Sequence, residues 1–224
     1  IIFYNVDILC FNLIFVILEV IGGSLMAIAV FGGTFDPIHL GHLIIAEQAY
    51  NSFDLEKIIF MPAGKPPHKL DKNITDDKMR LDMIKLAIAD NPHFLVSEWE
   101  LNRNQKSYTY ETLQYMKNKY PEKKIHFIIG SDSLYDIYEW KKTNFLLKNA
   151  NFILAKRPKA PIKGIFKNDE FRPYRQYINI LNNSLIDISS SQIRKLVSNN
   201  KSIKYLTLPE VINYIRENAL YRGD

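Results

Sequence analysis

The sequence contains a single cysteine, Cys10, among its 224 residues. One cysteine excludes a disulfide framework, and it excludes a zinc site built from several cysteines. Disulfides rarely form in the reducing cytoplasm, so the near-absence of cysteine fits a cytoplasmic protein. We therefore expect a cytoplasmic chain whose stability comes from an ordinary hydrophobic core.

No run of five or more basic residues occurs, although the formal net charge is +5. Scattered Lys and Arg residues do not predict a nucleic-acid-binding surface. A mildly basic balance suits small anionic substrates instead. We expect no nucleic acid among the partners, and the sequence leaves the oligomeric state open, a homo-oligomer included.

Residues 1–25 are apolar but contain no Lys or Arg. A signal peptide needs a basic start, and a membrane helix needs about 20 consecutive apolar residues. We expect neither, and no membrane association. Met26 is the expected natural start, with residues 1–25 translated from upstream DNA and residues 26–224 forming one domain. Polar residues interrupt the apolar stretch at Asn5, Asp7, Asn12 and Glu19.

From Met26 onward, strand-like and helix-like segments alternate. This alternation predicts an α/β fold, a Rossmann-like doubly wound parallel sheet with helices on both faces. Such sheets bind ligands at the carboxyl ends of their strands. The expected strands are 28–31, 57–61, 94–97, 125–129, 151–155 and 185–188. The expected helices are 42–53, 76–89, 109–119, 133–147, 191–198 and 209–217.

The run Phe31–His42 carries the strongest signal. Gly32 and Gly33 follow an apolar strand, and glycines let a phosphate approach the backbone closely. His39 and His42 stand at the start of a helix, whose free N–H groups and dipole favour anions. The spacing of the two histidines does not match the usual helical metal pair, which is i, i+4. Together these residues predict a cradle for a nucleotide triphosphate.

A second motif is Ile188–Arg194, in which serines precede a helix. Serines in this position are typical N-caps, so an ordinary helix start explains them equally well. Arg194 lies on the first turn, where a cation opposes the helix dipole. This placement indicates an anion, and serine hydroxyls with a guanidinium fork could form a second phosphate site.

Three weaker segments lie near the expected strand ends, and each has a plain structural alternative. Lys65–Lys69 is a Pro-rich loop with two lysines and a histidine, which would suit an anionic substrate. Ser107–Leu113 reads on its own as a capped helix start. Gly130 and Asp132 follow a strand, with Trp140 further along.

Taken together, these motifs resemble the superfamily that shares an HxGH motif with class I aminoacyl-tRNA synthetases. Ile188–Arg194 stands in place of the synthetases' KMSKS loop and is similar to the ISSTxIR motif of small adenylyltransferases, with Ser191 at the Thr position. Among these, the chain is most similar to bacterial nicotinate-nucleotide adenylyltransferases. The supporting pieces are GGTFDPIHLGHL, PPHK, SYTYETL, IIGSD and ISSSQIR, in family order.

The resemblance implies transfer of AMP from ATP to nicotinate mononucleotide, giving deamido-NAD and pyrophosphate, with Mg²⁺ accompanying ATP. It implies that His39, His42 and Arg194 are catalytic. The implied ATP-binding residues also include Gly32, Gly33, Thr34, Phe35, Gly130, Asp132, Ser190 and Ser191. The implied mononucleotide-binding residues are Lys65, His68, Lys69, Thr109 and Trp140. No metal ligands are implied.

Other readings of the same residues stay open at this point. A phosphopantetheine adenylyltransferase shares the fold and both phosphate motifs, and a cytidylyltransferase would prefer CTP. A non-catalytic nucleotide- or RNA-binding module would need aromatic and basic side chains interleaved on a sheet face. That last reading leaves the paired histidines unexplained.

Overall fold

The computed structural model describes residues 26–64, 74–103, 107–135, 137–158, 160, 162 and 172–222. Its centre is a six-stranded parallel sheet in the order β3-β2-β1-β4-β5-β6. The predicted doubly wound α/β fold is therefore confirmed. The strands are β1 (Ala27–Gly33), β2 (Leu55–Pro62), β3 (Phe94–Val96), β4 (Lys124–Gly130), β5 (Asn151–Ala155) and β6 (Ile178–Leu181).

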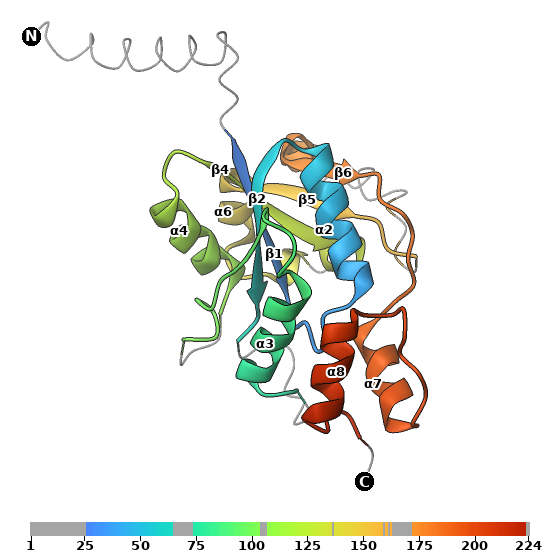
Figure 1. Ribbon diagram of the computed structural model, residues 1–224. Coiled ribbons are helices and arrows are strands. Elements are labelled where there is room, and N and C mark those ends of the chain that lie inside the picture. The colour runs from blue at the N-terminus through green and yellow to red at the C-terminus, as the bar shows by residue number, and fades with distance from the viewer. Residues whose placement is uncertain are drawn as a thin grey trace, which may run out of the picture.

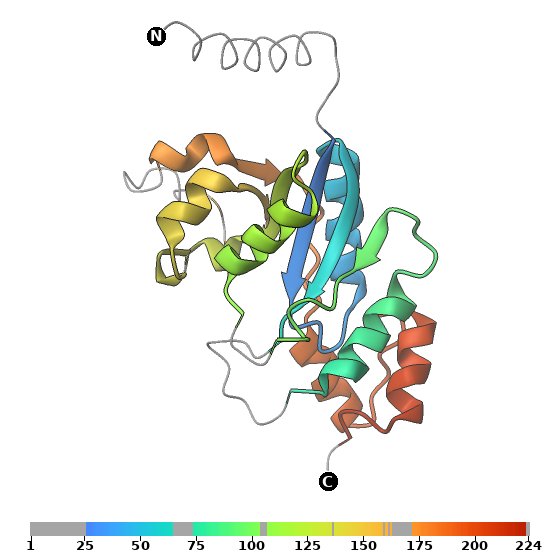
Figure 2. The ribbon, with the colours of Figure 1, turned by 90° about the vertical axis from the view of Figure 1, so that its left-hand side faces the viewer.

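Helices cover both faces of this sheet (Figures 1 and 2). The helices α2, α3, α7 and α8 belong to one face, and α4 and α6 to the other. The α-helices are α2 (Leu40–Ser52), α3 (Asp77–Ala87), α4 (Thr109–Lys119), α5 (Ser131–Tyr135), α6 (Thr143–Asn149), α7 (Ser190–Ser198) and α8 (Pro209–Glu217); two 3₁₀ helices are η1 (Ile137–Glu139) and η3 (Arg172–Tyr177).

Two hydrophobic cores form because the central strands bury both of their faces. In β1, Ala27, Ala29 and Phe31 enter the core under α2, while Ile28 and Val30 enter the core on the opposite face. Alternate side chains of a strand point to opposite faces, so a strand covered on both sides needs apolar residues throughout. This explains the continuous apolar run that precedes the two glycines.

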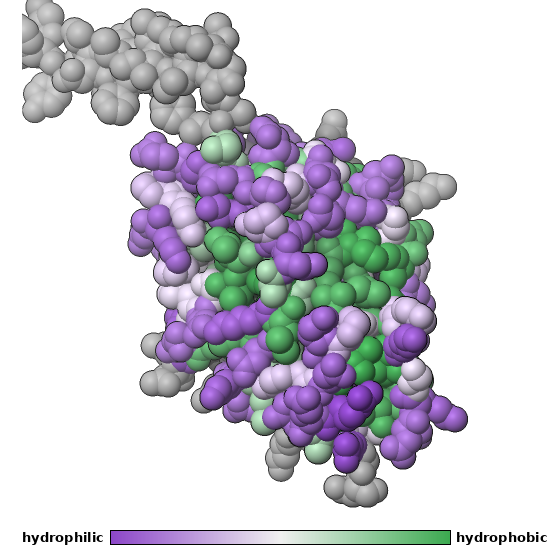
Figure 3. Space-filling view, in the orientation of Figure 1, coloured by the Kyte–Doolittle hydropathy of each residue, from purple (hydrophilic) through white to green (hydrophobic). Residues whose placement is uncertain are grey.

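On the face that carries α2, apolar side chains gather near the middle and hydrophilic ones surround them (Figure 3). Within the part of the chain that the structure describes, no helix is both long and apolar enough to cross a membrane. Residues 1–25 lie outside the described residues, so the boundary expected at Met26 stays a prediction.

The strand predicted at residues 185–188 is wrong. The edge position beside β5 belongs to β6, which pairs along Phe152–Ala155. After β6, the Asn183 side chain accepts from the Lys156 N–H at 2.7 Å and donates to the Lys156 carbonyl at 3.1 Å. These bonds pair both backbone polar groups of Lys156 just beyond the end of β5, and the chain then continues toward α7 with Leu185 63% exposed.

The helical stretch predicted over residues 133–147 contains helices but is not a single helix. That stretch is divided into α5, η1 and α6. Lys142, directly before α6, has a φ of 58°, which is left-handed backbone that an α-helix cannot contain. The interruption places Trp140 on a turn rather than on a helix face, and that position brings it to the site described next.

Candidate functional site

A cavity of about 450 Å³ opens at the carboxyl ends of β1 and β4. The strand order reverses between these two neighbours, since β2 and β3 extend the sheet to one side and β5 and β6 to the other. Ligands of doubly wound sheets bind at this switch point. Seven of the predicted site residues line the cavity: Gly32, Gly33, His42, Thr109, Gly130, Asp132 and Trp140.

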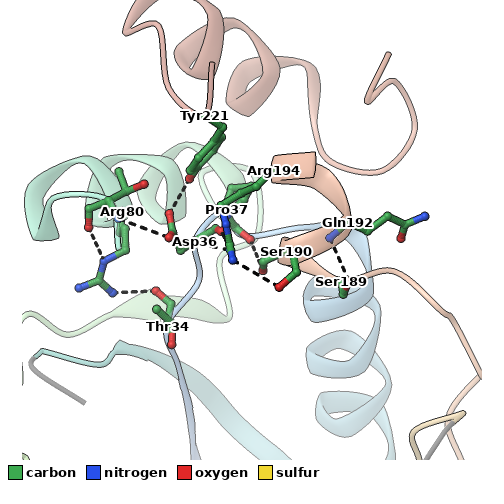
Figure 4. Close-up of polar contacts among 11 residues, drawn as sticks. Thr34, Asp36, Pro37, Arg80, Ser189, Ser190, Gln192, Arg194 and Tyr221 are labelled. Carbon is green, nitrogen blue, oxygen red and sulfur yellow. Dashed lines mark hydrogen bonds and ion pairs between the residues drawn. The ribbon is translucent and has the colours of Figure 1, made fainter. Parts of the chain in front are cut away.

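The loop between β1 and α2 carries both histidines, and side chains from distant elements hold its backbone. Four of its carbonyl groups each accept a side-chain hydrogen bond, which fixes the loop without any regular secondary structure. Figure 4 shows the region around three of them, at Thr34, Asp36 and Pro37. The donors are Arg80 to Thr34 at 2.7 Å, Arg194 to Asp36 at 2.6 Å, Ser190 to Pro37 at 2.8 Å and Thr207 to Ile38 at 2.9 Å.

The two histidines stack on each other at the end of this loop. Their ring centroids are 3.7 Å apart, and the Phe35 ring meets the His42 ring edge-on at 5.0 Å. A Cβ atom at Gly41 would lie 3.0 Å from His39 Nδ1, so only glycine lets the His39 ring lie this close to the helix. His39 is 2% exposed and His42 borders the cavity. His42 is therefore the histidine that a ligand in the cavity would meet.

Both imidazoles are neutral at pH 7. Burial, with a smaller contribution from the positive charge of Arg157, lowers the pKa of His39 to about 4. Burial, His39 and Arg157 hold the pKa of His42 well below its usual range. The backbone N–H of His39 donates a hydrogen bond to His42 Nδ1 at 3.3 Å. A neutral imidazole whose Nδ1 accepts carries its hydrogen on Nε2, so His42 is a hydrogen-bond donor there.

Two buried polar atoms on residues that line the cavity have no hydrogen-bond partner among the residues that the structure describes, Ser107 Oγ and Arg157 Nε. Buried polar groups are nearly always paired, so these two atoms are candidates for contact with a polar ligand. The guanidinium of Arg157 lies 4.0 Å from Asp132 Oδ1, a distance that leaves it available to a stronger anion. Ser107 and Arg157 approach the cavity from separate parts of the chain, after β3 and after β5.

The wall opposite the histidine loop is aromatic and contains the start of α4. Tyr108, Thr109 and Trp140 all line it. The Lys141 ammonium lies 4.4 Å from the centre of the Tyr108 ring. Burial raises the pKa of Glu100, which also lines the cavity and accepts a 2.6 Å hydrogen bond from the Thr112 hydroxyl. This wall offers rings for stacking and N–H groups at a helix start.

The remaining predicted residues are placed differently. Thr34, Phe35, His39, Ser190, Ser191 and Arg194 do not line the cavity. Phe35 is 2% exposed and packs beneath Gly33, where a Cβ atom would lie 2.9 Å from its ring. Arg194 donates to Asp36 and to Ser191. Lys65, His68 and Lys69 lie outside the described residues, so their predicted role is untested.

Sequence reasoning missed Arg157 and Gly64. Arg157 stands two residues after β5, the same kind of strand-end position that singled out Gly130 and Asp132. A Pro- and Lys-rich segment follows it and reads as ordinary loop. Gly64 lines the cavity, and a Cβ atom there would lie 2.4 Å from the Glu100 carbonyl oxygen. That close approach joins segments far apart in sequence, so no local sequence pattern predicts it.

The chain is similar in sequence to known proteins over most of its length. The cytidylyltransferase-like family model matches residues 30–196. A protein of Caldicellulosiruptor bescii named "Probable nicotinate-nucleotide adenylyltransferase" is 42% identical over 200 residues, covering 88% of this chain and 100% of the relative. A protein of the same name from Moorella thermoacetica is 44% identical over 202 residues, covering 87% of this chain and 91% of the relative.

Solved structures share the fold. The Plasmodium falciparum nicotinic acid mononucleotide adenylyltransferase complexed with NaAD has a TM-score of 0.73 at 23% identity, covering 88% of this chain and 97% of that one. The same protein complexed with APC has a TM-score of 0.72 at 22% identity, with the same coverage. The extent and level of identity to the curated relatives place the chain in the nicotinate-nucleotide adenylyltransferase family.

Proposed function

We propose that this chain transfers the AMP moiety of ATP to nicotinate mononucleotide, releasing pyrophosphate and forming deamido-NAD. The observation that carries the proposal is the cavity at the switch point of the sheet. It joins the glycine turn and His42 on one wall to Thr109 and Trp140 on the other. Phosphate-binding and ring-binding groups therefore face one space.

His42 acts as a hydrogen-bond donor to the α-phosphate. Its Nε2–H is neutral and fixed in direction by the stacked His39 ring and the hydrogen bond at Nδ1. Negative charge grows on the oxygens of the α-phosphorus as the new bond forms. A donor that is already oriented stabilises this charge without reorganising during the reaction. His39 supports this geometry from beneath the cavity wall.

The triphosphate lies along the glycine turn and extends toward α7. Gly32 has no atom within 4 Å of a Cβ position, so the space beside its backbone can admit a phosphate. Ser190, Ser191 and Arg194 at the start of α7 hold the β- and γ-phosphates that leave as pyrophosphate. Arg157, which lines the same cavity and whose Nε has no hydrogen-bond partner among the described residues, adds a positive charge.

The mononucleotide occupies the aromatic wall. Its pyridinium ring is cationic, and a cation stacks favourably on an electron-rich indole such as Trp140. The nicotinate carboxylate is received by Thr109 and the N–H groups at the start of α4, where the helix dipole favours an anion. Lys65, His68 and Lys69 bind the phosphate of the mononucleotide, and Asp132 lies beside the ribose of ATP.

The chemical step needs no general base. An oxygen of the mononucleotide phosphate attacks the α-phosphorus, the bond from that phosphorus to the bridging oxygen breaks, and pyrophosphate carries away the electron pair. The attacking phosphate is already ionised near neutral pH, because its second pKa is about 6. Positioning two anions in line and stabilising the added charge are then the main contributions of the protein.

Mg²⁺ is proposed to enter with ATP. Among the residues that the structure describes, no three His, Cys, Asp or Glu side chains converge to hold a metal ion. This donor set fits a cation that is bound mainly by phosphate oxygens and water, as Mg²⁺ usually is at nucleotide sites. The carboxylate residues on the cavity wall are Glu100, Asp132 and Glu139. The charge of a Mg²⁺ ion bound to the phosphates would reduce repulsion between the two substrates.

Pyrophosphate release tests the proposal directly. The purified protein is assayed with ATP or CTP against nicotinate mononucleotide, nicotinamide mononucleotide and phosphopantetheine. We expect the highest kcat/KM with ATP and nicotinate mononucleotide. Turnover only with CTP, or only with phosphopantetheine, would reject the proposal in favour of another transferase, and no turnover with any pair would favour a binding module.

A further inference from the structure

Near the end of the chain, Tyr221 reaches back to the loop that carries the two histidines (Figure 4). Its hydroxyl donates to Asp36 Oδ1 at 2.6 Å, across 185 positions of sequence. The Asp36 side chain is 4% exposed. A buried carboxylate with a single strong partner at one oxygen is sensitive to the loss of that partner.

Asp36 also contacts Thr75, which precedes α3, and Arg194, which the proposed function uses. Its Oδ2 accepts from the Thr75 N–H at 3.3 Å, and its backbone carbonyl accepts from Arg194 Nη1 at 2.6 Å. The same Arg194 nitrogen lies 3.9 Å from Asp36 Oδ2, which is an ion-pair distance but too long for a hydrogen bond. The carboxylate is thus held close to the guanidinium without binding it tightly.

The tail is fixed so that the tyrosine reaches this carboxylate. The Leu220 N–H donates to the Ile215 carbonyl at 3.0 Å, and the Leu220 side chain packs against the core under α8. Tyr221 has a φ of 60°, which is left-handed backbone that a bulky residue adopts only when surrounding contacts hold it there. Burial and the Asp36 charge raise the pKa of Tyr221, so its hydroxyl stays a donor.

We propose that Tyr221 is a positioning residue for ATP, acting through Asp36 on Arg194. By holding the Asp36 carboxylate away from Arg194, the tyrosine hydroxyl leaves the guanidinium N–H groups that do not bond to the Asp36 carbonyl or Ser191 able to meet the leaving phosphates. Without the hydroxyl, the carboxylate rotates onto Arg194 and forms a charge-assisted hydrogen bond that competes with phosphate. This inference rests on the proposed function, in which Arg194 binds the β- and γ-phosphates.

Tyr221→Phe removes only the hydroxyl. We expect the apparent KM for ATP to rise about tenfold, the scale of one hydrogen bond to a charged group, while the KM for the mononucleotide changes less than about twofold. Tyr205→Phe is the matched control, because Tyr205 lies between α7 and α8 and is 75% exposed. Its kinetics should match the wild type.

The double variant Tyr221→Phe with Asp36→Asn separates positioning from a merely structural role. An uncharged amide competes poorly for Arg194, so the KM for ATP should return to within about threefold of the wild type. A structural role of the tail predicts instead that the two losses add. Asp36→Asn alone keeps the tyrosine, and we expect it to bind ATP at least as tightly as the wild type.

ATP dissociation constants measured by calorimetry on the full chain keep this inference apart from the proposed function. A wild type that binds ATP but transfers nothing rejects the function. Equal ATP dissociation constants for wild type and Tyr221→Phe overturn the positioning role, as does a double variant that binds ATP more weakly than Tyr221→Phe.

Discussion

The imidazole rings of His39 and His42 stack with their centroids 3.7 Å apart and their planes inclined by 25°. Only His42 borders the cavity, and His39 fills the space between it and Gly41. The residues of the HxGH motif are therefore placed differently: the His42 ring faces the cavity, the His39 ring packs against it, and Gly41 lets the His39 ring approach the helix.

His42→Ala should lower kcat by at least about a hundredfold, the usual cost of losing one donor that acts in the transition state. The KM values should change much less, because the donor matters most when charge develops. Fixed-time assays of pyrophosphate release measure kcat, and a thermal melt confirms that the variant is folded. Near-normal turnover in a folded variant would reject the role given to His42.

Gly41→Ala tests the close approach of the His39 ring. The added Cβ atom would lie 3.0 Å from Nδ1 and must displace the ring. We expect lower stability and a lower kcat, since the stacked pair moves. Gly32→Ala is the matched control, with nothing within 4 Å of its Cβ position. It should leave the melting temperature unchanged and raise the KM for ATP, and equal stability loss in both variants would contradict this account.

Trp140→Ala should raise the apparent KM for nicotinate mononucleotide and leave the KM for ATP close to the wild-type value, because the proposed stacking partner of the pyridinium ring is removed. Trp99→Ala serves as the control. Trp99 stacks on Tyr115 at 4.6 Å and does not line the cavity, so its loss should affect stability rather than either KM. A change confined to the KM for ATP would show that Trp140 has another role.

Arg80→Met should destabilise the fold by about 3 kcal/mol or more, because it leaves three partly buried carbonyl groups without their charged donor. Arg80 is fully buried and donates to the carbonyls of Thr34, Ala63 and Thr75. Denaturant titration measures the loss. Lys85 lies on the same helix as Arg80 and forms an exposed ion pair with Glu98. Lys85→Met breaks this ion pair and should cost less than about 1 kcal/mol. Similar losses in the two variants would argue against Arg80 as an anchor.

Folding stability should fall as the pH decreases from about 6.5 toward 4. His39 has a pKa of about 4 in the folded chain and near the ordinary value of 6.5 in the unfolded chain. Within this window the unfolded state binds the extra proton, which favours unfolding. Burial, together with Lys124, also lowers the pKa of His126 to about 4, so it adds to the same slope.

Imidazole NMR resonances followed against pH, alongside denaturation curves, check this dependence. The resonances of His39 should stay in their neutral positions down to about pH 5. A His39 midpoint near 6.5, or a stability that does not change over the window, would contradict the burial argument.

The strand–helix alternation and the motif residues were readable from the sequence because they depend on local features. Apolar strands, glycines at a strand end and histidines at a helix start are neighbours along the chain. The same local logic failed at residues 185–188 and 133–147. At the first, the Asn183 side chain pairs with the backbone N–H and carbonyl of Lys156, just beyond the end of β5. At the second, the left-handed backbone of Lys142 interrupts the helix.

The sequence by itself determined the α/β class, the glycine–histidine loop and the family resemblance, all of which follow from residues close together in the chain. Only the tertiary structure decided which strand ends meet, and so brought Gly130 and Arg157 to the cavity beside Gly33. It also decided that Arg80 and Tyr221 hold the histidine loop. These contacts join residues 46 and 185 positions apart, and no local pattern encodes such pairings, because they depend on how the whole sheet and its helices pack.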